Sequence, residues 1–238
     1  MRKFAEKSPV VFEIILVIAA FALALAFGLP CQAASFDNEL SMAVGRILAG
    51  ILMLLIFRRC FDFSKQFKGF VVMLPALVFA LWNIANHFIT KGDFNPFTLD
   101  ILILGLAPAV FEEVLFRGIF IHNLKAAGRS DMAALIIPAL LFGAVHLTNA
   151  VNGDILQALV QTGYAVVVGL VFGAIYIRTG DLFSVMLAHA AIDITNRIFM
   201  GAAITPVPVI IAFIVMLAIM ALYAFKLVER HTIEKHQN

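Results

Sequence analysis

Long apolar segments recur along the whole chain, and they constrain its fold more than any other feature. Eight of them are close to the roughly 20 residues that a helix needs to cross the hydrocarbon core of a bilayer. They run approximately over residues 9–30, 40–57, 69–90, 98–121, 131–149, 155–177, 181–201 and 207–227. With 63% hydrophobic and 13% charged residues, the chain differs strongly from an average soluble domain, in which about 25% of residues are charged. The sequence therefore predicts an all-α, polytopic membrane helix bundle of about eight transmembrane helices.

The positions of lysine and arginine indicate how these helices are oriented. Cytoplasmic loops of membrane proteins collect positive charge. If the N-terminus is cytoplasmic, thirteen basic residues fall on the inner side and only Lys91 on the outer side. The thirteen are Arg2, Lys3, Lys7, Arg58, Arg59, Lys65, Lys68, Lys125, Arg129, Arg178, Lys226, Arg230 and Lys235. A missing or additional span would scramble this alternation, so we expect both the N- and the C-terminus in the cytoplasm.

The loops between the predicted spans are short, which leaves no room for a soluble domain. We therefore expect a single transmembrane domain over residues 1–238, integral to a bacterial cytoplasmic membrane and surrounded by its lipids. The first segment could instead be a cleaved signal peptide, because Arg2 and Lys3 precede it. Its apolar run is long for that role, which favours a retained helix. The basic residues flank the spans, so the net charge of +2 does not indicate a nucleic-acid partner.

Three ionisable residues lie within six positions of each other inside one of the most apolar stretches. They are Glu112, Glu113 and Arg117. Each charged side chain at bilayer depth costs about 2.5–3.5 kcal/mol on insertion scales, so such a cluster indicates a functional site. Glu113 and Arg117 are four residues apart on one helix face and predict an ion pair. Glu112 is turned about 140° from Arg117 at 100° per residue, which predicts a separately directed carboxylate.

Further ionisable side chains occur in the fifth and seventh apolar segments. His146 lies near the end of the fifth, and the seventh contains His189 and Asp193, whose four-residue spacing places them on one helix face. A carboxylate, two imidazoles and a second carboxylate, brought together in a low-dielectric bundle, can activate water for hydrolysis. These four side chains, Glu112, His146, His189 and Asp193, could instead bind one divalent metal such as zinc. Sequence does not decide between a metal and a metal-free site.

The chain resembles the CPBP family of intramembrane proteases, which includes the CAAX prenyl endopeptidases and bacteriocin-processing or immunity proteins. The resemblance rests on three signatures, E-E-x-x-x-R, F-x-x-x-H and H-x-x-x-N/D. They correspond to Glu112-Glu113 with Arg117, Phe142 with His146, and His189 with Asp193. Their order, spacing and placement in spans agree with the family across roughly residues 98–200. The first three spans and the last one carry no such signature.

The resemblance implies an intramembrane endopeptidase that cleaves membrane-associated protein or peptide substrates. In that reading Glu112 and His146 activate a water, His189 and Asp193 stabilise the oxyanion, and Glu113, Arg117 and Phe142 support them. A proton-coupled transporter is the main alternative, because buried Glu, His and Asp relays are equally natural there. We find no internal repeat that would favour it. A catalytically silent scaffold or immunity protein is a third hypothesis, which the complete set of motif residues disfavours.

The predicted depths of the site residues pose a geometric problem. On straight helices at 1.5 Å per residue, Glu112 would lie deeper toward the inner side than His146, by roughly 10 Å or more. Kinks at Pro108 and Pro138, a steep tilt, or a fourth helix that continues past the membrane boundary would remove this offset. We therefore expect the crossing to be irregular here. Because the charged cluster lies toward the inner side, we also expect the cavity to face the cytoplasm.

Overall fold

The computed structural model describes residues 8–151, 153–202 and 205–237, and over these ranges helices dominate. The long helices are α2 (Pro9–Ala33), α3 (Asn38–Ile56), α5 (Val78–Thr90), α6 (Leu99–Glu113), α8 (Asp131–Val145), α9 (Ile155–Thr179), α10 (Leu182–Ile198) and α11 (Val207–Gln237). The short ones are η1 (Arg58–Cys60), η2 (Phe63–Lys65), α4 (Phe70–Met73), η3 (Leu74–Leu77), η4 (Val114–Ile121), α7 (His122–Ala126) and η5 (His146–Val151). The prediction of an all-helical membrane protein is confirmed.

Six helices are long and apolar enough to cross a membrane. They cover Pro9–Ala33, Asn38–Ile56, Phe70–Thr90, Asp131–Val151, Ile155–Thr179 and Val207–Glu234. The other two predicted spans also fall on helices, but α10 has only 17 residues, and the helix that begins at Leu99 carries the charged cluster. The count of eight spans is therefore not confirmed and stays a prediction.

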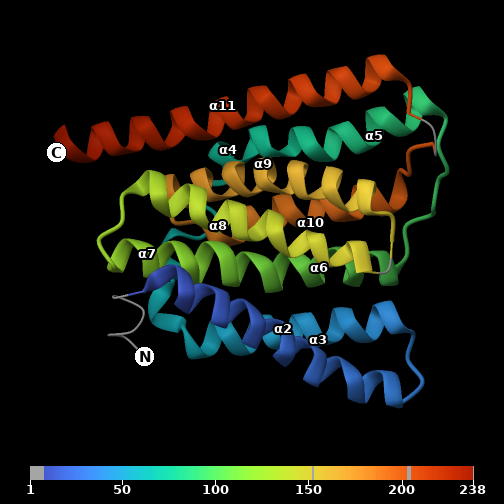
Figure 1. Cartoon of the computed structure of the whole chain (residues 1–238), viewed down its shortest axis with the longest axis horizontal. Coiled ribbons are helices and arrows are strands. Elements are labelled where there is room, and N and C mark those ends of the chain that lie inside the picture. Colours follow the sequence, from blue (N-terminus) through green and yellow to red (C-terminus); the bar gives the residue numbers. More distant parts are fainter. Residues whose placement is uncertain (1–7, 152, 203–204, 238) are drawn as a thin grey trace.

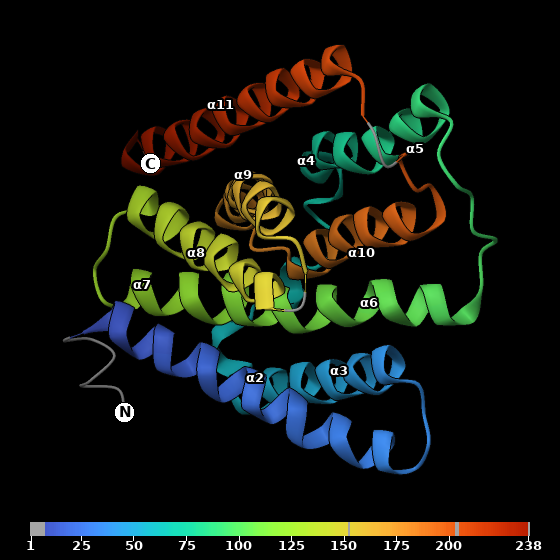
Figure 2. The same cartoon turned by 45° about the vertical axis from the view of Figure 1, so that its right-hand side comes forward.

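The helices form layers on either side of the helix that carries the charged cluster (Figures 1 and 2). The pair α2 and α3 packs on one side of α6, and α8, α9 and α10 lie on the other. The outermost positions beyond α9 and α10 are taken by α5 and α11. This arrangement surrounds α6 and η4 with protein on both sides. All eight residues of η4 are buried, so its charged residue is kept away from lipid.

Polar residues just before the helices of the central group fix where these helices begin. Thr98 accepts a hydrogen bond from the backbone of α6, Ser130 from that of α8, Asp154 from that of α9, and Asp181 from that of α10. Such N-caps satisfy donors that would otherwise have no partner at a helix start. Each cap fixes the residue at which its helix begins. The start of the helix in turn determines which of its side chains face the interior of the bundle.

The helix predicted as the fourth crossing is irregular, as the sequence-based depths of Glu112 and His146 led us to expect. Helix α6 passes at Glu113 into η4, a π-helical segment, and continues through α7 to Ala126. The helix therefore extends beyond the predicted boundary at residue 121. π-helical segments occur frequently at functional sites. Here the change of helix type begins directly after the two glutamates.

Small residues bring the helices of the central group close together. A Cβ atom added at Gly169 of α9 would lie 3.1 Å from the Cα atom of Ala139 of α8. One added at Gly105 of α6 would overlap the side chain of Ile194 of α10. These close approaches hold α8 beside α9 and α10 beside α6, as expected for bundles with small residues at helix interfaces. Gly163 of α9 takes no part in this close packing, because a Cβ atom added there would meet no atom within 4 Å.

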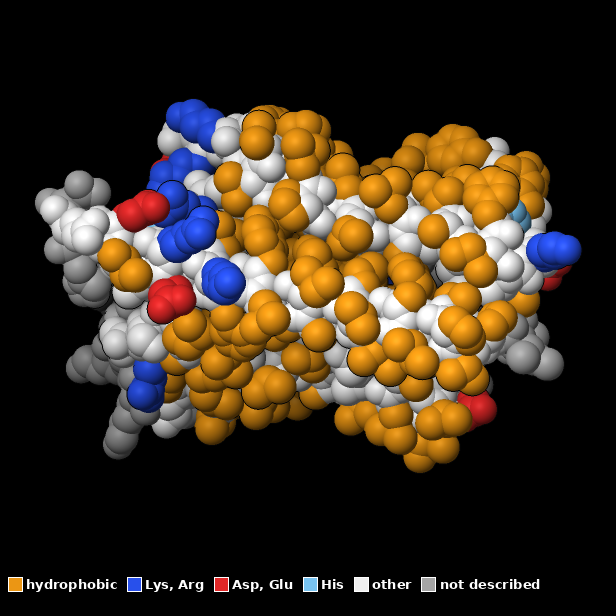
Figure 3. All heavy atoms as spheres, turned by 90° about the horizontal axis from the view of Figure 1, so that it is seen from above, with side chains coloured by type: hydrophobic (Ala, Val, Ile, Leu, Met, Phe, Trp, Pro, Cys, Tyr) orange, Lys and Arg blue, Asp and Glu red, His pale blue; other side chains and the backbone are white. Residues whose placement is uncertain are grey.

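The two ends of the bundle differ in charge. The start of α2 and the end of α11 lie at the same end (Figure 1). Lys and Arg side chains gather at that end, and a broad apolar band follows (Figure 3). Of the thirteen predicted inner residues, the described ones lie on segments at this end: Arg58, Arg59, Lys65, Lys68, Lys125, Arg129, Arg178, Lys226 and Arg230. Arg2, Lys3 and Lys7 lie outside the described residues, as does the side chain of Lys235.

Candidate active site

The predicted ion pair between Glu113 and Arg117 is present and fully buried. Arg117 Nη1 donates to Glu113 Oε1 at 2.9 Å, and the side chains are 2% and 0% exposed. The guanidinium group also lies over two aromatic faces, 4.4 Å from the ring centroid of Phe142 and 5.4 Å from that of Phe172. Cation–π contacts of this kind stabilise a cation that has lost its water. Arg117 is therefore held by one carboxylate and two rings.

His189 connects this ion pair to the other acidic residues. Its Nδ1 atom lies 2.6 Å from Glu113 Oε1, the same oxygen that Arg117 contacts. Because a carboxylate oxygen accepts, Nδ1 carries a proton, and the ring orientation is fixed. The other ring nitrogen, Nε2, lies 3.7 Å from Asp193 Oδ2 and 3.9 Å from Glu112 Oε2. Glu113 thus acts as a support that aims Nε2 toward Glu112 and Asp193.

His146 is oriented by the backbone of its own helix. Its Nδ1 atom lies 2.8 Å from the carbonyl oxygen of Phe142, one turn earlier. A carbonyl can only accept, so the proton is on Nδ1 and Nε2 is left as the acceptor of the ring. The ring of Phe142 packs edge to face on His146 with centroids 5.0 Å apart. Phe142 therefore positions His146 with its carbonyl and Arg117 with its ring.

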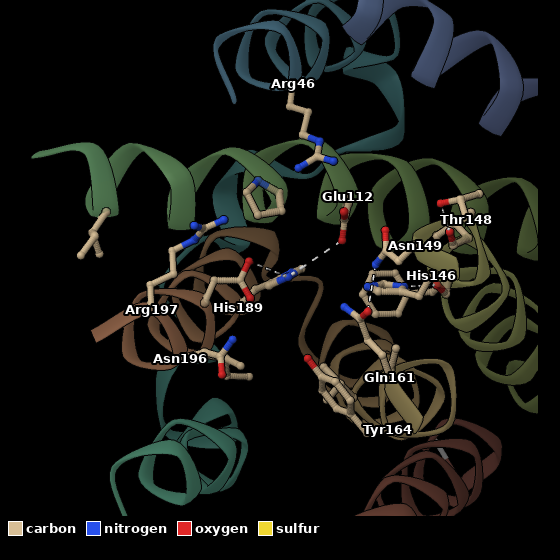
Figure 4. A pocket seen from close by; sticks show the side chains of 18 of the residues that line it. Arg46, Glu112, His146, Thr148, Asn149, Gln161, Tyr164, His189, Asn196 and Arg197 are labelled. Carbon is tan, nitrogen blue, oxygen red and sulfur yellow. Dashed lines mark hydrogen bonds and ion pairs between the residues drawn. The ribbon is translucent and has the colours of Figure 1, made fainter. Parts of the chain in front are cut away.

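A cavity of about 590 Å³ joins these residues. Glu112, His146, His189 and Asp193 all line it, and they come from α6, the α8–η5 junction and α10. Figure 4 shows the labelled Glu112, His146 and His189 turned toward the same space. Glu112 and His189 are buried, and the side chain of Asp193 is 27% exposed. The structure brings together all four residues that the sequence marked as catalytic, while Glu113 and Arg117 lie behind them.

The cavity reaches the surface at the end of the bundle opposite to the basic residues. Its exposed lining residues are Asn95, Thr148, Asn149, Asn196 and Met200. They belong to the loop after α5, to η5, and to the end of α10 and the loop that follows it. No lining residue comes from the basic end. The expectation of a cavity facing the predicted cytoplasmic side is therefore wrong, because the site residues open toward the C-terminal end of α10 and not toward α7.

Three lining residues were not predicted as part of the site. Arg46 of α3 points into the cavity from the side of α2 and α3, and Tyr164 and Gln161 of α9 face it from the other side (Figure 4). Arg46 had a detectable signal, since a cation inside an apolar span is costly unless it is used. Tyr164 and Gln161 had none, because nothing in their spacing distinguishes a cavity wall from a packing face.

The donor set does not fit a metal ion. Within residues 8–151, 153–202 and 205–237, no three His, Cys, Asp or Glu side chains are grouped closely enough to hold one. His189 already uses Nδ1 on Glu113, and its Nε2 is 3.7 Å or more from the nearest oxygens of Asp193 and Glu112. We therefore assign no step to a metal.

Comparison with known families agrees with the signatures. Residues 94–195 match the family model described as type II CAAX prenyl endopeptidase Rce1-like. The central part of the chain is therefore similar to the CAAX prenyl endopeptidases. The matched segment contains Glu112, His146, His189 and Asp193, whereas α2, α3 and α11 lie outside it. Searches of the curated proteins and of the solved structures give no match. This similarity suggests intramembrane protease activity in a helical membrane protein.

Proposed function

We propose that the protein is an intramembrane endopeptidase that hydrolyses peptide bonds of membrane-associated protein or peptide substrates. The observation that carries this proposal is the convergence of Glu112, His146, His189 and Asp193 on one cavity. A cavity of about 590 Å³ is within the range of about 300–1,000 Å³ that is usual for ligand sites.

Glu112 is the general base of the proposed reaction, with His146 as its partner. Both face the cavity, and the proton on His146 Nδ1 leaves Nε2 able to accept a hydrogen bond from water. A water held between them loses a proton to Glu112 as its oxygen bonds to the carbonyl carbon of the substrate. When the carbon–nitrogen bond breaks, the same proton passes to the leaving amine. Such proton transfer contributes typically about 10²–10⁴-fold to the rate.

His189 is the proposed donor to the oxyanion. Glu113 holds its Nδ1 atom, which leaves Nε2 directed toward the cavity side of the ring. When Nε2 carries a proton, it can donate to the negative oxygen of the tetrahedral intermediate. Asp193 cannot donate as a carboxylate, so we assign it to holding His189. Removing one oxyanion donor costs about 10²–10³-fold in other hydrolases.

The cavity geometry favours hydrolysis over transport. A carrier must expose its site to both sides of the membrane in turn, usually through repeated halves. Here the exposed lining residues within the described chain all belong to one end, and we find no internal repeat in the sequence. The carrier is tested with the protein reconstituted into sealed vesicles. Proton-coupled uptake of a substrate without any peptide cleavage would reject the protease proposal in favour of a carrier.

The proposal is tested by reconstituting the purified protein with a peptide library and identifying products by mass spectrometry. Cleavage that is lost in Glu112→Ala and His146→Ala supports it. Glu13→Gln is the matched control, because Glu13 is a fully buried carboxyl group of α2 that does not line the cavity. Metal analysis of the same sample, with and without a chelator, tests the zinc alternative. Unchanged cleavage in Glu112→Ala would refute the assigned base.

A further inference from the structure

The position of the cavity opening and the charge of the two bundle ends together bear on which substrates can reach the site. The opening lies at the end formed by the loop after α5, by η5 and by the end of α10. The loops at this end are tied together, since Asn95 N donates to the carbonyl of Ile198 at 3.0 Å and Met200 N to that of Asp93 at 3.0 Å. We call these loops and helix ends around the opening the rim. Because they are joined by hydrogen bonds, the rim is a defined structure and not a gap between helices.

The charge asymmetry assigns this end to the outer side of the membrane. The opposite end holds the basic residues of η1, η2, α7, α9 and α11 (Figure 3). By sequence, thirteen basic residues belong to that end and Lys91 to the rim end. Positively charged loops remain in the cytoplasm. Arg46 and Arg117 lie in the interior of their helices. Arg197, in the last turn of α10, is a second basic residue at the rim end, so the asymmetry is thirteen against two.

We infer that the active-site cavity is reached from the non-cytoplasmic face of the membrane. This inference rests on the proposed protease function and gives it a substrate class. Substrates are exported or membrane-anchored peptides whose scissile bond lies on the outer side, near the bilayer surface. A protein tail in the cytosol would meet the basic end, where no lining residue of the cavity is found.

The side of the opening can be tested without any assay of activity. The native cysteines, Cys31 and Cys60, are both free and are replaced by serine. Thr148→Cys then places one thiol on the rim, and Ser64→Cys in η2 places one at the basic end; both positions are exposed. In intact cells, a membrane-impermeant maleimide should label Thr148→Cys, whereas Ser64→Cys should react only after permeabilisation. Labelling with the opposite pattern would overturn the inference.

A second experiment connects the side of the opening to cleavage. The two cysteine variants are reconstituted into sealed vesicles, and an impermeant peptide is added outside. A polyethylene-glycol maleimide on Thr148→Cys should abolish cleavage, while the same reagent on Ser64→Cys should leave it within about twofold of the unmodified protein. If no variant cleaves any peptide even in detergent, the protease proposal itself fails. Cleavage that is blocked at Ser64→Cys instead would keep the protease and reject the outer opening.

A separate observation concerns Arg46, which lies outside the segment that matches the family. It is half-buried and lines the cavity, yet among the described residues it has no ion pair or hydrogen bond. Arg197 also lines the cavity, but its Nη1 atom already contacts Glu39 Oε2 at 3.2 Å. In Figure 4 the guanidinium group of Arg46 points toward the same space as Glu112. A cation in a membrane-embedded cavity without a partner is costly unless a ligand supplies the anion.

We propose that Arg46 binds a carboxylate of the substrate and so acts as a specificity residue of the proposed protease. Guanidinium and carboxylate form paired hydrogen bonds, which fix the position of the bound peptide relative to Glu112. The carboxylate can be a free C-terminus or an acidic side chain. Because this contact serves binding, its loss should raise KM more than it lowers kcat.

The test compares Arg46→Gln with wild type on a cleaved peptide and on its neutral analogues. With the charged peptide, KM should rise about 10–100-fold, with kcat within about threefold of the wild-type value. Amidating the C-terminus, or replacing the acidic residue by its amide, should remove the difference between the two enzymes and so identify the carboxylate. Lys91→Gln is the control, since it removes a positive charge at the same end outside the cavity. An equal loss of kcat on charged and neutral peptides would overturn the proposal.

Discussion

The buried pair of Glu113 and Arg117 makes the sharpest prediction about stability. Both side chains are at most 2% exposed, and Glu113 Oε1 is shared between Arg117 and His189. The variants are Glu113→Gln, Arg117→Met and the double substitution. Each keeps the volume of the side chain close to the original, so that charge and hydrogen bonding change more than packing does.

The expected magnitudes follow from what each single substitution leaves behind. Glu113→Gln leaves the cation of Arg117 buried with only the faces of Phe142 and Phe172, and breaking a buried pair in this way costs about 3–5 kcal/mol. Arg117→Met leaves Glu113 bonded to His189, so the cost is the lost charged hydrogen bond and ring contacts, about 2–3 kcal/mol. The double variant contains neither charge, and replacing a buried pair by neutral groups is often close to neutral. The loss of unfolding free energy in the double variant should therefore be smaller than the sum of the losses in the two single variants by at least about 2 kcal/mol.

The free energy of unfolding is measured by titrating a denaturing detergent into the protein in nonionic micelles. We expect both singles to unfold at lower detergent fraction than the double variant. The double variant should also keep cleavage activity within about 10²-fold of wild type, because Glu112 and the cavity remain and only the orientation of His189 is weakened. Additive losses in the double variant would refute the reasoning, since they would show that neither charge depends on the other.

Two further predictions concern packing and pH. Gly169→Leu forces α9 away from Ala139, which should cost about 1–3 kcal/mol of stability and lower activity by moving His146. Gly163→Leu, at a position that faces open space, should change neither stability nor activity. Equal effects in both variants would contradict the packing argument. Burial raises the pKa of Asp181, but the hydrogen bonds from Ser184 and from the backbone of Gly69 and Phe67 together outweigh burial, so the pKa lies below its usual value. Its stabilisation is then complete above the unfolded pKa of about 3.9 and is lost as pH falls through the lower folded pKa. The difference in melting temperature between wild type and Asp181→Asn should therefore shrink below about pH 4, and a difference that stays constant with pH would argue against this cap.

The features that sequence predicted well are those set within a single helix. The spacing of four residues correctly predicted that Glu113 pairs with Arg117, and it placed His189 beside Asp193, with Nε2 and Oδ2 3.7 Å apart. Each predicted apolar segment also falls on helical structure, although six helices rather than eight are long and apolar enough to cross a membrane. Helical periodicity is local, so one sequence is enough to read it.

The features that sequence did not predict depend on how helices pack. The π-helical segment η4 follows Glu113 without any local signal. The end at which the cavity opens depends on where α6, α8 and α10 cross, and the charge cluster alone suggested the wrong end. Arg46 points into the cavity, which its position inside an apolar span did not predict. Its actual direction is set by α3 packing against α6, which no spacing within α3 encodes.

The central claim is that Glu112 activates the attacking water. The most direct measurement is the single-turnover cleavage rate of Glu112→Gln reconstituted into vesicles. Wild type and the buried control Glu13→Gln are measured in parallel, each in its own vesicles. We expect Glu112→Gln to remain folded and bind peptide but to cleave at least about 10³-fold more slowly than wild type, with Glu13→Gln close to wild type. A folded Glu112→Gln that cleaves within about tenfold of wild type would contradict the account.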